Sequence, residues 1–63
     1  MSEEARQAKS ILFKLGITDG LKHINQLIYF AEELNSEAVL LYWTRVKEQF
    51  VYATNNNTPN KEK

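Results

Sequence analysis

The chain combines a length of 63 residues with a complete lack of cysteine, and this combination limits its fold more than any other feature. A domain of about 60 residues buries only roughly 60% of the surface that its unfolded chain exposes. Without cysteine, neither a disulfide framework nor a thiolate zinc site can supply the missing stability. We therefore expect a single small domain over residues 1–54, with too little material for both a sizeable core and an enclosed catalytic cleft.

Charge and hydropathy narrow the class of protein further. Eight basic residues balance eight acidic ones, so the chain lacks the broad electrostatic attraction of a nucleic-acid or anionic-membrane binder. Its longest apolar run, residues 38–43, is much shorter than the roughly 20 residues that span a bilayer. The acidic start, residues 1–4, lacks the basic and apolar regions of a signal peptide. We therefore expect a cytoplasmic protein that does not use a membrane.

The first segment predicts a helix over about residues 2–15. Its apolar side chains recur at helical spacing, at Ala5, Ala8, Ile11, Leu12 and Leu15. Ser2 can cap the first turn by accepting a backbone N–H. Gly16 is expected to end the helix in a left-handed conformation, with Ile17 packing back onto Leu12 in a Schellman-type ending.

A second helix is predicted over about residues 18–34, with Thr18 as its N-cap. Its apolar face consists of Leu21, Ile24, Leu27, Ile28, Ala31 and Leu34. Gly20 is expected to weaken the first turn by about 1 kcal/mol relative to alanine. The helix can end at Asn35, a residue type that tolerates the left-handed conformation.

A third helix over about residues 36–54 follows from a shift in the apolar pattern. Its strongest stripe is Val39, Trp43, Val46, Phe50 and Ala53, which is one step out of register with the heptad continuation of the second helix. A break at Asn35 explains the shift, with Ser36 as the next N-cap; the alternative is one helix from Thr18 to about Thr54. The predicted fold is all-α: a small three-helix bundle, or a helical hairpin preceded by a short helix, that self-associates. We expect the polar tail, residues 55–63, to be disordered.

The residues that could carry chemistry do not form a recognisable catalytic or metal motif. His23 is the one histidine, and Asp19 lies one helical turn before it, but neither a nucleophile nor further ligands lie nearby in the sequence. Glu32, Glu33 and Glu37 are expected to solvate the helix ends beside the second connection. We therefore predict no enzyme, no catalytic residue, no cofactor and no metal site.

A helix-turn-helix-like DNA-binding regulator is the alternative function. Residues 31–39 have a small residue, a turn and a following helix at roughly the required spacing. The first residues of that following helix would have to reach bases and phosphates, which favours Arg, Lys, Asn, Gln or Ser. Here they are acidic and aliphatic, beginning with Glu37. Nucleic-acid binding is therefore the less favoured prediction.

The third helix carries more apolar side chains than one core requires. Val39, Val46 and Phe50 are expected to serve the intramolecular core. The predicted interface is the remainder: Leu40, Leu41, Tyr42, Trp43, Val51 and Tyr52. Aromatic residues are enriched at protein interfaces, where Lys and Glu are depleted. We therefore expect a small non-enzymatic helical protein that acts through protein–protein interaction, as a homodimeric adaptor or regulator. The expected partner is a second copy of the chain, another protein, or both.

Overall fold

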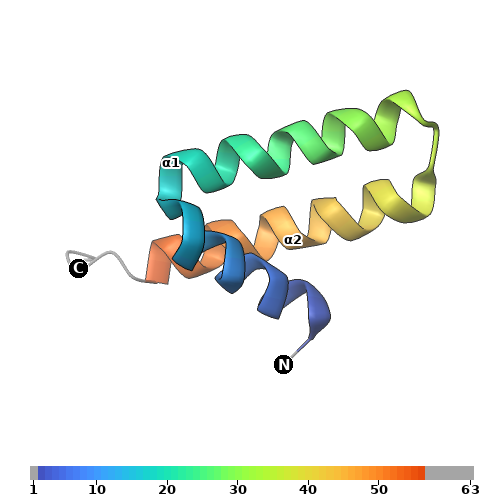
Figure 1. The fold of residues 1–63 in the computed structure, drawn as a ribbon. Coiled ribbons are helices and arrows are strands. Elements are labelled where there is room, and N and C mark those ends of the chain that lie inside the picture. The colour runs from blue at the N-terminus through green and yellow to red at the C-terminus, as the bar shows by residue number, and fades with distance from the viewer. Residues whose placement is uncertain (1, 57–63) are drawn as a thin grey trace.

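The computed structural model describes residues 2–56, which form two helices, α1 (Glu3–Glu33) and α2 (Glu37–Asn56) (Figure 1). The predicted all-α class is confirmed, and no strand occurs among the residues described. The predicted count of three separate helices is not matched. The segments expected at 2–15 and 18–34 are two arms of one bent helix, α1, and α2 runs antiparallel beside the second arm.

The start of α1 confirms the predicted N-cap. Ser2 has extended backbone angles, φ −76° and ψ 162°, and its Oγ accepts a hydrogen bond from the Ala5 N–H at 3.1 Å. Glu3 and Glu4 lie in the first turn, where their carboxylates meet the positive end of the helix dipole. This end of the helix is therefore determined by local interactions.

Gly16 bends α1, but not through the expected Schellman ending. Its φ of 84° is positive as predicted, whereas its ψ of −176° lies in a region that is essentially restricted to glycine. It is the residue with non-helical angles inside α1, so the helix resumes directly and Thr18 is not an N-cap. Ile17, expected to pack back onto Leu12, is 58% exposed. The backbone of one glycine therefore sets the direction of arm 3–15 relative to arm 17–33.

The connection between the helices forms the Schellman motif that was expected at Gly16. Asn35 is left-handed, with φ 55°. The Asn35 N–H donates to the Glu32 carbonyl at 3.1 Å and the Ser36 N–H to the Ala31 carbonyl at 3.2 Å, which is the paired pattern of this ending. The predicted break at Asn35 is confirmed, and the continuous helix is wrong. At its other end α2 continues to Asn56, beyond the predicted end at 54, and residues 57–63 of the predicted tail lie outside the described part.

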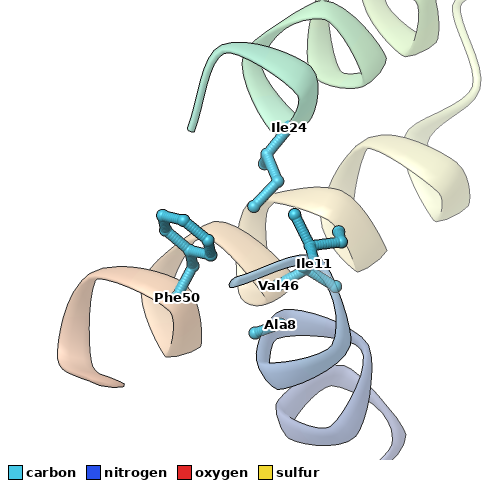
Figure 2. Packing of buried hydrophobic residues seen from close by; sticks show 5 residues of the cluster. All are labelled: Ala8, Ile11, Ile24, Val46 and Phe50. Carbon is cyan, nitrogen blue, oxygen red and sulfur yellow. The ribbon is translucent and has the colours of Figure 1, made fainter. Parts of the chain in front are cut away.

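The core lies where arm 3–15 crosses the pair formed by arm 17–33 and α2. Figure 2 shows side chains from all three segments converging there: Ala8, Ile11, Ile24, Val46 and Phe50. Val46 and Phe50 were expected in the core and are 0% and 1% exposed. Leu12, Leu21, Ile28, Tyr42 and Trp43 pack around this cluster. We call residues 3–28 and 42–56 the base of the molecule, and residues 29–41 the tip.

Several residues assigned to the core by helical spacing are exposed instead. Val39, expected to serve the core, is 41% exposed, and Leu34, the last residue of the predicted second stripe, is 75% exposed. Both lie in the tip, alongside which arm 3–15 does not extend. Leu15, the last residue of the first stripe, is 43% exposed at the bend. Their spacing is correct for a core, but no third segment covers them.

Packing in the core explains why position 20 is a glycine, which could not be inferred from the sequence. It is buried, and a Cβ atom at this position would lie 2.7 Å from Cζ of Phe50 and 3.2 Å from Cγ2 of Ile11. The missing side chain therefore makes room for the Phe50 ring. The expected cost of Gly20 to helix stability is offset by the packing that it permits.

Candidate interaction surface

Two of the six predicted interface residues support the fold. Tyr42 and Trp43 pack against the core, and their rings meet edge to face with centroids 5.0 Å apart. Burial, followed by the negative charges of Glu3 and Glu4, raises the pKa of Tyr42 above its ordinary value of 10.0.

The other four predicted residues lie on two different sides of α2. A helix turns by about 100° per residue, so Leu40 and Val51 share one side, and Leu41 and Tyr52 share another. Leu41 and Tyr52 are 53% and 65% exposed. The charged residues Arg45 and Glu48 lie between them along the helix. The structure therefore does not bring the six predicted residues together on one surface.

Exposed apolar side chains also occur on both arms of α1 and at Leu34, which directly follows it. The most exposed are Phe13 at 91%, Leu34 at 75%, and Tyr29 and Phe30 at 59% each. The Tyr29 and Phe30 rings are themselves in edge contact, with centroids 6.2 Å apart. Phe13, Tyr29 and Phe30 fall outside the helical stripes and so could be found from the sequence. Leu34 could not, because its spacing matches a core position.

Arm 3–15 covers one side of the helix pair and leaves the opposite side open. Ile11 approaches the Gly20 side of arm 17–33, and Tyr42 of α2 packs against the cluster that contains Ala8 and Ile11 of the same arm. We define the open face as the residues roughly opposite Gly20 and Tyr42 on their helices. On arm 17–33 these are Thr18, Lys22, Asn25, Tyr29 and Glu33, and Glu32 lies beside them on the side nearer α2, where it lines a depression with Glu37 and Leu40. On α2 they are Glu37 and Val51, which are exposed, and Leu40, Thr44 and Lys47, which are half-buried.

Two shallow depressions adjoin the open face. One, mostly apolar, is lined by Ile17, Thr18, Leu21, Lys22, Asn25, Gln26 and Tyr29. The other lies at the tip and is lined by Ala31, Glu32, Asn35, Ser36, Glu37 and Leu40. Both are open to solvent rather than enclosed. Their shape suits contact with a surface better than the enclosure of a small substrate.

Charge is distributed unevenly along the molecule. The tip contains Glu32, Glu33 and Glu37 and no Lys or Arg, whereas the open face at the base carries Lys22 and Lys47. Glu32 and Glu33 lie in the last turn of α1, which has no basic residue, and face the negative end of the helix dipole. Such a placement costs about 0.3–1 kcal/mol per charge. A cation brought to the tip from outside would relieve this cost.

His23 and Asp19, the residues considered for catalysis and metal binding, are both exposed. No group of three His, Asp or Glu side chains within residues 2–56 is arranged to hold a metal ion. In the same part of the chain, neither helix is sufficiently long and apolar to cross a membrane.

Comparison with known proteins does not assign a family. The chain matches no family model, and neither a curated protein nor a solved structure matches it significantly.

Proposed function

We propose that this protein is a small non-enzymatic helical adaptor or regulator that acts through protein–protein contact and forms a homodimer. The observation that carries the proposal is the balance of apolar side chains. Within residues 2–56 the buried core consists of Ala8, Ile11, Ile24, Ala31, Val46 and Phe50, two of them alanines, whereas ten large apolar side chains are exposed. The cytoplasmic location expected from the sequence stays part of this proposal.

Association would bury part of this exposed apolar surface and thereby stabilise the folded protein. Burying a large apolar side chain contributes about 1.5–3 kcal/mol. In a chain of this size without disulfides or metal, burial and ordering entropy nearly cancel, so oligomerisation is a common remedy. Of the predicted interface residues, Leu41, Val51 and Tyr52 are exposed and Leu40 is half-buried, whereas Tyr42 and Trp43 pack within the monomer.

Sedimentation equilibrium over a wide concentration series tests the proposal. The expected result is an apparent mass that rises from the 7.3 kDa of one chain towards twice that value. A mass that stays at 7.3 kDa up to about millimolar concentration, where even a weak pair of roughly 4 kcal/mol would form, would contradict the homodimer.

The DNA-binding alternative receives less support from the arrangement of the helices. Arm 17–33 and α2 run antiparallel (Figure 1), whereas the helices of a helix-turn-helix cross at about 90–120°. Glu37, at the start of the helix that would read DNA, is exposed and would face phosphates. Fluorescence anisotropy with duplex DNA at low salt tests this alternative, for which salt-sensitive binding would be the supporting result.

A further inference from the structure

We infer that two copies pair through the open face in an antiparallel orientation, so that the tip of each copy lies over the base of the other. This inference rests on the proposed homodimer and adds the face, the orientation and the contacts that select them. The occupant of the open face is thus a second copy of this chain.

The centre of the open face has the composition of an interface centre. Asn25, Tyr29, Leu40 and Thr44 lie there and none is charged. Charged residues are depleted and tyrosine is enriched at the centres of protein interfaces. Tyr29 is 59% exposed and would be the aromatic anchor of the contact.

The charges at the two ends of the open face are arranged symmetrically. Lys22 and Glu32 on arm 17–33 are ten residues apart, and so are Glu37 and Lys47 on α2. Each pair therefore spans about 15 Å along its helix. In both cases the cation is at the base and the anion is at the tip.

This spacing selects one orientation of the second copy. A two-fold axis that lies in the face and crosses both helices midway places Lys22 of each copy over Glu32 of the other. It also places Lys47 of each copy over Glu37 of the other. A parallel arrangement would instead place lysine over lysine and glutamate over glutamate. Rim charges of this kind contribute more to orientation than to affinity.

The antiparallel pair also relieves the unfavourable charge at the tip. Glu32 and Glu33 lie in the last turn of α1 without a basic residue, and Lys22 of the second copy would supply the missing cation. A positive charge at the negative end of a helix dipole is favourable. The same contact thus compensates a defect of the monomer and determines the register of the dimer.

The open face is short, because its residues extend over about 21 Å of each helix. The contact is therefore smaller than a standard interface of roughly 800 Å² per partner. We expect a weak dimer, with charge pairs near both ends of the face.

A charge-swap experiment tests the pairing. Lys22→Glu and Glu32→Lys are made separately, and the dissociation constant of each dimer is measured by analytical ultracentrifugation. Each homodimer would contain two repulsive contacts, and we expect its dissociation constant to rise about tenfold. Mixed in equal amounts, the two variants form a heterodimer in which both contacts are attractive again. The mixture should therefore associate within about threefold of wild type.

Lys9→Glu is the matched control for this experiment, because it makes the same charge change at an exposed site on arm 3–15. It should leave the dissociation constant within about twofold of wild type. A wild-type protein that remains monomeric overturns both the homodimer and this inference. A wild-type dimer whose two variants do not recover on mixing overturns the antiparallel pairing alone and leaves the homodimer intact.

A second pair of variants locates the face independently of charge. Leu40 belongs to the open face, and its neighbour Leu41 points about 100° away from it. We expect Leu40→Gln to weaken the dimer, and Leu41→Gln to leave it unchanged while circular dichroism shows wild-type helicity for both. Weakening by Leu41→Gln alone would overturn the inference, because it would place the interface on the Leu41 and Tyr52 side of α2.

Discussion

The base and the tip of this molecule contain similar apolar side chains, but large ones are buried only at the base. At the base, three helical segments meet, and Ile24 and Phe50 are 0% and 1% exposed. At the tip only arm 17–33 and α2 lie side by side (Figure 1), and Phe30 and Leu34 are 59% and 75% exposed. The difference arises from the third segment rather than from the hydrophobicity of the residues. In this hairpin the small Ala31 is buried at the tip by the helix pair alone, but the large apolar side chains there stay wholly or partly exposed beyond the reach of the additional arm.

The largest expected effect contrasts one side chain from each region. Phe50→Ala removes a fully buried ring from the base and should destabilise the fold by about 3–5 kcal/mol. A chain of this length has only roughly 3–9 kcal/mol of stability in total, so this variant should be largely unfolded. Leu34→Ala at the exposed tip should change stability by less than about 0.5 kcal/mol. Urea unfolding followed by circular dichroism measures both, and equal losses would remove the distinction between base and tip.

The two connections differ in the backbone conformation that they require. Gly16→Asn should destabilise the protein by about 1–3 kcal/mol, because the φ and ψ of Gly16 lie outside the left-handed region that asparagine tolerates. At the tip, Asn35 has φ 55°, which glycine adopts easily, so Asn35→Gly should be neutral or slightly stabilising. Thermal unfolding of both variants provides the comparison. Wild-type stability in Gly16→Asn would show that the bend does not depend on glycine.

A smaller effect is expected from close packing within the base. Gly20→Ala gains about 1 kcal/mol of helix propensity but crowds the Phe50 ring, at a cost of about 1–3 kcal/mol. The expected net change is a loss of about 1 kcal/mol. If crowding is the cause, the same substitution should be neutral or stabilising in a Phe50→Leu background. A double-mutant cycle in urea measures the coupling, and additive effects would contradict this account of Gly20.

The smallest expected effect concerns pH at the junction of base and tip. Burial and the charges of Glu3 and Glu4 raise the pKa of Tyr42 in the folded state. The neutral phenol is therefore favoured by folding, and its contribution to stability is complete at neutral pH. That contribution is lost as the pH rises through and above about 10. Between about pH 9 and pH 11, the free energy of unfolding should fall less for Tyr42→Phe than for wild type. Urea unfolding at several pH values measures this, and an equal fall in the two proteins would contradict it.

Features of the fold that depend on neighbours in the chain could be predicted. Ser2 caps the first helix by bonding to Ala5, and Asn35 ends α1 in a left-handed conformation. The buried positions of Val46 and Phe50 also follow from helical spacing. At Gly16 the need for positive φ could be predicted, but not the ψ that determines the direction of the bend.

Features that depend on which segment lies opposite could not be predicted in the same way. Val39 and Val46 are both valines on the same stripe of α2, yet one is 41% exposed and the other 0%. Likewise, the six predicted interface residues share one short helix but lie on different sides of it. Periodicity gives the angle of a side chain around its helix and carries no information on what covers that side.

The order of the amino acids was sufficient to predict the all-α class, the N-cap at Ser2, the break at Asn35 and the stripes that supply the core. These depend on interactions between residues a few positions apart, which the order of amino acids specifies directly. Only the tertiary structure decided that Gly20 makes room for Phe50, that arm 3–15 covers the base and not the tip, and that one face of the hairpin stays open. Those outcomes depend on the path of the backbone at Gly16, because a single pair of dihedral angles places arm 3–15 against the rest of the molecule.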